Sequence, residues 1–206
     1  INKFGLTDKK FKKIFVQAKK NRKLFENQVL SWLVKNVEIN PLGYACIFIK
    51  TLSALPQEEF IFVINRVLVT VSGKIYPPKT KTIINFYNKI RSKETNSFFN
   101  LGGCHIFFDR LNLDKIFICR EITRKKRKLL LYAKNEKIIW DNRYEIKSNK
   151  VTFVYLKKRL GNSIFVDQLK SDGWEKICLI DKNFKKNKSN LPLKFIFTLP
   201  TLKNRN

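Results

Sequence analysis

The sequence of 206 residues predicts an α+β fold, in which an N-terminal helical subdomain is followed by a small β-rich subdomain. Up to residue 93, apolar residues recur with the spacing of a helix face. From residue 94 onward, short β-branched and aromatic runs are separated by turn residues. Hydrophobic residues make up 44% of the chain, enough for a folded core. We therefore expect two domains, residues 1–93 and residues 94–206.

Residues 7–37 are predicted to form one long helix or two helices in sequence. Phe11, Ala18, Phe25 and Trp32 recur every seven residues and form an apolar stripe. Lys and Arg occupy the opposite face, and the first 36 residues contain ten basic and two acidic side chains. A charged helix face is usually just solvated, but a face this basic also suits a phosphate backbone.

The second predicted helix covers residues 56–72. Its β-branched and aromatic core would also suit a strand. However, Pro56 suits a first helical turn, Glu58 and Glu59 suit the positive end of the helix dipole, and Gly73 suits a helix end. These borders favour a buried helix, in which Arg66 is interpreted as structural.

The third predicted helix runs from Lys79 to Arg91, after an extended turn set by the sequence IYPPKT. Its apolar stripe is formed by Ile83, Ile84, Tyr87 and Ile90. Lys79 and Lys81 stand at its N-terminus, where backbone amides also favour phosphate. We expect both lysines to contact RNA.

Six short runs are predicted strands: SFFNL, CHIFFD, KIFICRE, EKIIW, RYEIKS and VTFVYL. Gly102–Gly103 joins the first two as a two-residue hairpin turn, because glycine adopts positive φ at little cost. Asp141–Asn142 is predicted to be a second hairpin turn, with Trp140 and Tyr144 beside it in the core or, as the alternative, stacked on nucleic-acid bases. Residues 182–190 are predicted to form a basic loop.

Cys104 and His105 resemble an active site at first sight, because the only histidine follows a cysteine. Adjacent residues of a strand point to opposite faces, so His105 is badly placed to activate Cys104. We interpret Cys104 as structural, assign no catalytic residue and leave His105 without a role. Four widely spaced cysteines and a single histidine predict no metal site.

The net charge of +27, from 43 basic and 16 acidic residues, predicts a nucleic-acid partner. An A/T-rich genome would also raise the lysine content, but it explains the shortage of acids less well. The most basic run follows Arg120 and Glu121, which we interpret as a local ion pair. This run is either a solvated loop or a phosphate clamp on RNA, and its predicted contacts are Arg124, Lys125, Lys126, Arg127 and Lys128.

Two kinds of segment are missing from the sequence. No apolar run is long enough to cross a bilayer and the N-terminus does not resemble a signal peptide, so we expect a cytoplasmic protein without a membrane partner. The patterns GxxxxGK[ST], GxGxxG and SGGxDS are also absent, so we expect no ATP site and no cofactor in this chain. Because the chain begins with Ile1 and contains no Met, we expect a piece of a longer protein.

Several blocks together resemble a known family. They are ALPQEEFIFVINRVLVTVSGKIYPPKTKTIINFYNKI, FNLGGCHIFF, IFICRE, IIWDNRYEI and FTLPTL, which run from Ala54 to Leu202, and we take the resemblance to cover nearly all of residues 1–202. In order and spacing they resemble the region that follows the catalytic domain of tRNA(Ile)-lysidine synthetases, most closely those of the alphaproteobacterial branch. Family members are ATP-dependent ligases that join free lysine to the wobble cytidine of tRNA(Ile).

The resemblance implies that this chain binds tRNA and does not itself catalyse the reaction. In the family, an N-terminal PP-loop domain with an SGGxDS motif binds ATP and Mg²⁺, and that domain is missing here. The chain alone is therefore expected to be inactive and to hold tRNA(Ile), with residues 1–93 as a linker and substrate-binding domain and residues 94–206 as a tRNA-binding domain. Free lysine would be the parent enzyme's co-substrate, and the family also suggests a homodimer.

Two alternatives stay open. The chain could be a complete, non-enzymatic, basic RNA-binding protein, in which case the coding sequence before Ile1 would lack an in-frame SGGxDS. It could also be the remnant of a decayed gene, in which case it would not unfold cooperatively.

Overall fold

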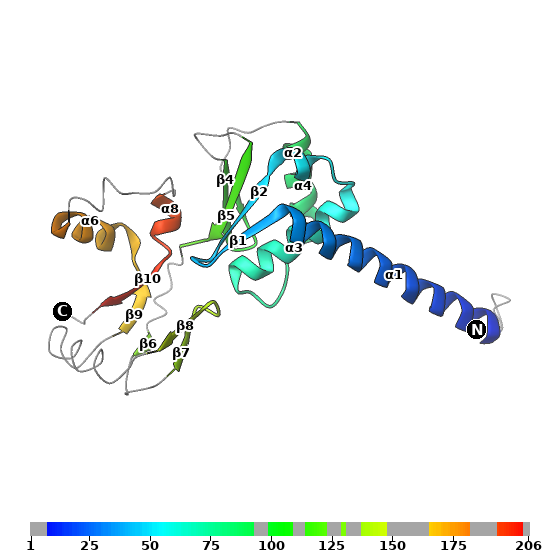
Figure 1. Cartoon of the computed structure of the whole chain (residues 1–206), viewed down its shortest axis with the longest axis horizontal. Helices are drawn as coiled ribbons and strands as arrows, with labels where there is room; N and C mark the ends of the chain where they lie inside the picture. The colour runs from blue at the N-terminus through cyan, green and yellow to red at the C-terminus, as the bar shows by residue number, and fades with distance from the viewer. Residues whose placement is uncertain are drawn as a thin grey trace.

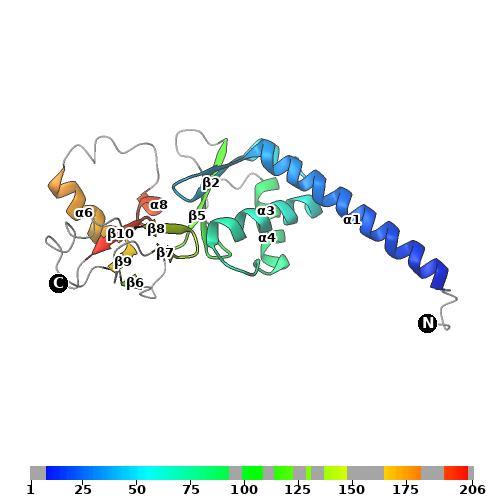
Figure 2. The same ribbon diagram turned by 60° about the horizontal axis from the view of Figure 1, so that its bottom comes forward.

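The computed structural model describes residues 8–92, 99–108, 114–122, 129–130, 137–147, 165–181 and 193–203. It confirms the α+β class, with a helical N-terminal part and a sheet-rich C-terminal part. Figure 1 shows a long N-terminal helix projecting from a central body, and a second group of elements on the opposite side of that body. The turned view in Figure 2 shows the same three regions in a row.

The three predicted helices are confirmed. They are α1 (Asp8–Asn36), α3 (Gln57–Ser72) and α4 (Thr80–Arg91). Gly73 ends α3 in the left-handed conformation with φ of 62°, and its N–H donates to the Val69 carbonyl. Glycine suits this position because it lacks the Cβ that opposes positive φ. A short helix, α2 (Ile49–Ser53), was not predicted.

The central body contains a five-stranded antiparallel sheet. Its strand order is β1 (Val37–Asn40), β2 (Tyr44–Phe48), β5 (Lys115–Arg120), β4 (Cys104–Phe108) and β3 (Phe99–Leu101). The predicted glycine hairpin joins β3 to β4, with φ of 63° and 85° at Gly102 and Gly103.

The hairpin β1–β2 was missed by the sequence analysis. It lies before residue 93, yet β2 pairs with β5 from beyond that position. The sheet therefore takes strands from both sides of the expected boundary between residues 93 and 94, and the two-domain division stays a prediction.

Helices cover one face of the sheet and form the main core with it. α3 crosses this face and buries Phe60, Ile64 and Leu68 completely, against Ile106 and Ile118 of the sheet. Because α3 also packs on α4 and α1, apolar residues surround most of it. That explains its strand-like composition.

Only the C-terminal part of α1 packs against the body. Phe25, Val29 and Trp32 contact the main core. Phe11 and Phe15, which continue the predicted stripe, are 57% and 63% exposed. The periodicity thus predicted the helix correctly, but its first half extends into solvent. None of the described helices combines the length and the hydropathy needed to cross a membrane.

The second group of elements is smaller and lies beyond the other face of the sheet. It contains a three-stranded sheet, a two-stranded hairpin and two helices: β9 (Phe165–Gln168), β10 (Pro200–Lys203), β6 (Leu129–Leu130), β7 (Lys137–Trp140), β8 (Tyr144–Lys147), α6 (Lys170–Ile180) and α8 (Leu193–Ile196). Phe195 and Ile196 of α8 pack on Cys119, Phe107 and Tyr44 of the five-stranded sheet.

The predicted strands in the described residues are all confirmed, as β3, β4, β5, β7 and β8. The sixth predicted run, VTFVYL, and the predicted loop 182–190 lie outside the described residues. Trp140 is buried as predicted, in a small cluster with Val166 and, beside it, Tyr144.

The turn of the β7–β8 hairpin is held against the central body by a buried ion cluster. Arg120 Nη2 donates to Asp141 Oδ1 at 2.8 Å, and Arg143 Nη2 donates to Asp141 Oδ2 at 2.9 Å. All three side chains are buried. The expected pair of Arg120 with Glu121 is therefore wrong, because the Arg120 side chain pairs across the fold with the hairpin turn.

Gly43 and Gly73 let the backbone approach the β7–β8 hairpin closely near this ion cluster. A Cβ on Gly43 would lie 2.7 Å from Tyr144 Oη, and a Cβ on Gly73 would lie 2.9 Å from the Asp141 carbonyl oxygen. Asn142 Nδ2 also donates to the Gly73 carbonyl at 3.2 Å. The hairpin turn thus contacts the β1–β2 turn and the end of α3, two segments far apart in the sequence.

We expect the substitution Asp141→Asn to destabilise the fold by about 3–5 kcal/mol, because it leaves two buried guanidinium groups without a carboxylate. Urea unfolding followed by tryptophan fluorescence measures this loss. The control is Glu145→Gln, which removes the exposed pair with Lys137 and should cost less than about 1 kcal/mol. Equal losses in the two variants would contradict the role assigned to the buried cluster.

Candidate nucleic-acid interface

Cys104 and His105 do not form a reactive pair. Cys104 points into the main core, where its Sγ donates to the Leu68 carbonyl at 3.7 Å. Burial raises the pKa of the Cys104 thiol to about 12, although Arg120, Arg143 and Lys74 oppose the shift. Among the described residues, no three His, Cys, Asp or Glu side chains gather as metal ligands would.

His105 lies on the other face of the sheet, as strand alternation predicted. Its Nδ1 is 2.6 Å from Asn100 Oδ1 on the neighbouring strand. Burial lowers the pKa of His105, and nearby Glu121 opposes that shift. The residue is thus part of the contact between β3 and β4, and nothing in its surroundings points to catalysis.

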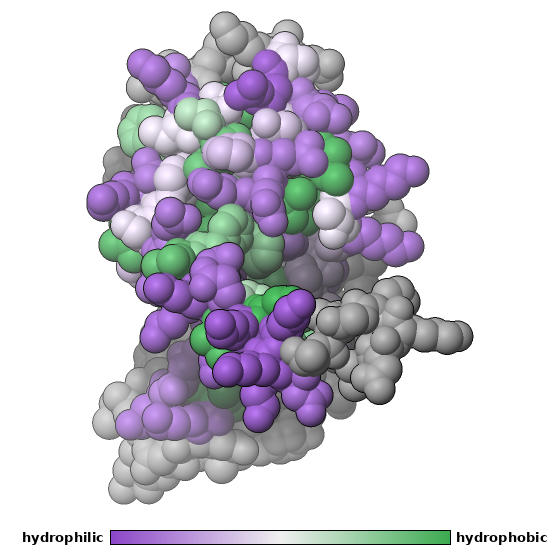
Figure 3. Space-filling view, turned by 90° about the vertical axis from the view of Figure 1, so that its right-hand side faces the viewer, coloured by the Kyte–Doolittle hydropathy of each residue, from purple (hydrophilic) through white to green (hydrophobic). Residues whose placement is uncertain are grey.

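Basic residues on α1 form the first candidate surface for RNA. The helix carries nine basic and two acidic side chains over its 29 residues. One of the basic residues, Arg22, pairs with Glu26 at 2.9 Å. Seen from the side on which α1 projects, the surface is largely hydrophilic, with hydrophobic side chains between (Figure 3).

The start of α4 forms the second candidate surface. Lys79 is the N-cap residue of α4 and Lys81 lies in its first turn, and both are exposed. No side chain caps this helix end. The first amide groups of α4 therefore add to the positive potential that the two lysines create. This is the arrangement that the sequence predicted for phosphate contact, and the contact itself stays a prediction.

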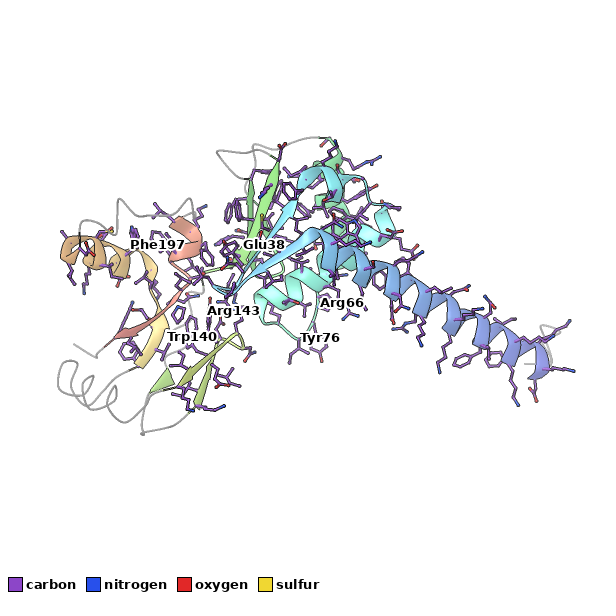
Figure 4. The ribbon with its side chains drawn as sticks, viewed as in Figure 1. Glu38, Arg66, Tyr76, Trp140, Arg143 and Phe197 are labelled. Carbon is purple, nitrogen blue, oxygen red and sulfur yellow. The ribbon has the colours of Figure 1, made fainter. Side chains whose placement is uncertain are left out.

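Tyr76 is a candidate contact that the sequence analysis missed. It is 80% exposed in the loop between α3 and α4, where Lys74 is exposed as well. Figure 4 shows Tyr76 projecting from the central body, on the side where Arg66 of α3 also projects. The two prolines that follow Tyr76 restrict the loop to extended conformations, so the ring is not folded onto the core.

We call Lys74, Tyr76, Lys79 and Lys81 the α3–α4 surface. It combines cationic groups with an exposed aromatic ring, the two features by which proteins hold unpaired RNA. Arg66, interpreted as structural from the sequence, is exposed instead. The predicted phosphate clamp Arg124–Lys128 lies outside the described residues and stays a prediction. Trp140 is too deeply buried to stack on a base.

Comparisons with known proteins confirm the resemblance seen in the sequence blocks. The chain is 30% identical over 108 residues to the tRNA(Ile)-lysidine synthase of Wolbachia pipientis wMel, covering 52% of this chain and 24% of that protein. It is 29% identical over 143 residues to the tRNA(Ile)-lysidine synthase of Rickettsia bellii (strain OSU 85-389), covering 66% of this chain and 31% of that protein.

The chain thus spans about a quarter to a third of the length of these curated relatives. No protein-family model matches it, and no solved structure matches it either.

We expect only one of the four thiols to react quickly in the folded chain. Cys46, Cys104 and Cys119 are buried, and burial raises the pKa of Cys104 and Cys119 to about 12, whereas Cys178 is partly exposed. A colorimetric thiol reagent should therefore modify Cys178 first and the others only after unfolding. The variant Cys178→Ser should lose the fast phase. A fast reaction at Cys104 in that variant would contradict the structural role of this residue.

Proposed function

We propose that this chain is the tRNA-binding part of a tRNA(Ile)-lysidine synthase. The observation that supports this most strongly is the similarity to synthases from Wolbachia and Rickettsia. It supports a role in tRNA modification, and the basic composition of the chain suits a polyanionic partner. The α3–α4 surface supplies exposed groups of the right chemistry for that contact.

RNA binding and catalysis can be carried out by separate parts of one protein. Lysine and arginine contacts to phosphates position an RNA without reading its bases. A basic part can therefore supply affinity and register, while a separate site performs the reaction. The buried thiol of Cys104 and the structural contact of His105 leave the one unusual pair of this chain without a catalytic role.

The activity of the whole protein is part of the proposal. It would join the ε-amine of free lysine to the wobble cytidine of tRNA(Ile) in the cytoplasm, using ATP and Mg²⁺ bound by a PP-loop domain outside this chain. A homodimer would be consistent with the family resemblance. If the coding sequence before Ile1 contains no in-frame SGGxDS, the alternative of a non-enzymatic RNA-binding protein becomes the better one.

We expect the full chain to retard tRNA(Ile) in a gel, with an affinity that falls steeply as salt rises. The double variant Lys79→Glu/Lys81→Glu should weaken binding and lower the slope of log affinity against log salt by about two. The matched control is Lys50→Glu/Lys176→Glu, which makes the same charge change at two exposed lysines, one in α2 and one in α6, that are not among the residues of the α3–α4 surface.

The same assay tests the run Arg124–Lys128, because reversing its charges should also weaken binding. Unchanged affinity would remove the run from the interface. If the control variant weakened tRNA binding as much as the Lys79 and Lys81 variant, general charge would explain the binding and the α3–α4 surface would not be the interface.

We expect this chain alone to consume no ATP in the presence of lysine, tRNA(Ile) and Mg²⁺, because it lacks the phosphate-binding motif of the family. Pyrophosphate release measures this, with the complete Rickettsia bellii protein as the positive control. Lysine-dependent release by the chain alone would overturn the assignment of the chemistry to another domain.

A further inference from the structure

We propose that the groove between α4 and β3 binds one unpaired nucleotide of the RNA. This inference rests on the proposed RNA-binding function and names the part of the RNA that this region recognises. The groove has a volume of about 470 Å³, which is in the size range of small-ligand sites. Lys79, one of the two lysines at the start of α4, lines it, whereas Lys81 does not.

The floor of the groove is aromatic. Phe86 of α4 and Phe99 of β3 meet edge to face, with ring centroids 5.5 Å apart. Phe86 is buried, but Phe99 is only partly buried. Lys89 Nζ lies over the Phe99 ring, 4.8 Å from its centroid, so a base that packed on this ring would also meet the lysine cation. Every nucleobase has a π-face that can pack on such a ring.

One wall of the groove is the edge at which the described strands of the five-stranded sheet end. β3 is the last strand in the order, and its residue Asn100 lines the groove. Asn100 pairs with His105, and the next pair, Leu101 with Cys104, closes the two-residue turn. A turn of this type closes on a hydrogen-bonded pair, and such pairs alternate with non-hydrogen-bonded ones.

The backbone N–H and C=O of Asn100 therefore point away from β4, toward this edge of the sheet. The bond from the Glu121 N–H to the Gly103 carbonyl, at 2.9 Å, supports this register, because it makes His105 direct its own backbone groups to β5. A donor and an acceptor side by side complement the hydrogen-bonding edge of a base.

Charge favours a nucleotide over a peptide in this groove. Lys79 and Lys89 both line the groove, and they lie ten positions apart in the sequence. Thr82 and Asn85 stand between them in the sequence, and none of the ten described residues that line the groove is acidic. The groove thus offers an aromatic floor for a base, a polar wall for its edge and two lysines for the phosphates.

The test uses the full chain and two short RNA hairpins, one fully paired and one with a single bulged 2-aminopurine nucleotide. We expect the bulged hairpin to bind about tenfold more tightly, with a change in 2-aminopurine fluorescence. Asn85→Leu, inside the groove, should abolish this preference and keep the affinity for the paired hairpin. Asn88→Leu, an exposed asparagine of α4 that does not line the groove, should keep both.

A second pair of variants makes the same test with charge. Lys89→Gln should reduce the preference for the bulged hairpin, whereas Lys81→Gln should weaken both hairpins equally. Equal affinity of the unmodified chain for the two hairpins, or an unchanged preference in Asn85→Leu, would overturn the inference and leave the proposed function intact. If neither hairpin bound, the inference and the proposed function would both be contradicted. If an acidic peptide displaced only the bulged nucleotide from the groove and the rest of the RNA stayed bound, the groove would be a peptide-binding site instead.

Discussion

The fold depends on one buried carboxylate at a hairpin turn. Asp141 lies between the guanidinium groups of Arg120 and Arg143, so two cations share the interior with one anion. The attraction between these charges offsets their desolvation cost only while the three side chains keep their geometry. That geometry fixes where the β7–β8 turn sits, and Gly43 and Gly73 then leave room for its backbone and for Tyr144. The end of α3, the β1–β2 turn and the last residue of β5 are thereby held at one point.

The main helices and most described strands could be predicted from the sequence because their signals are local. Helical stripes, the glycines at positions 73, 102 and 103 and the Asp141–Asn142 turn each depend on a few neighbouring residues. The hairpin β1–β2 was missed because it lies between helices, in a part of the chain where the apolar spacing is otherwise helical. The partner of Arg120 was wrong for a related reason. Glu121 is its neighbour in the sequence, whereas Asp141 approaches it only through tertiary packing.

At the candidate interface, too, the sequence predicted local features but not those that depend on tertiary packing. Lys79 and Lys81 were predicted because a helix start is visible in the sequence, and the structure places both on the exposed first turn of α4. Tyr76 was not predicted, because its exposure depends on how the loop after α3 leaves the core. The groove could not be predicted either, since it joins a helix face to a strand edge. Local reasoning thus identified the charged groups, while the aromatic and backbone groups beside them required the three-dimensional structure.

The helix α1 is long enough for its N-terminal end to lie well away from the body of the protein. It is fixed to the body near Phe25, Val29 and Trp32, while the apolar side chains of its first half, such as Phe11 and Phe15, are exposed. Each residue of an α-helix adds about 1.5 Å of length and about 100° of rotation. Inserting one residue into the free half would therefore turn and displace any group attached near Asp8, without touching the core. The orientation of such a group relative to the body therefore depends on the number of residues in α1.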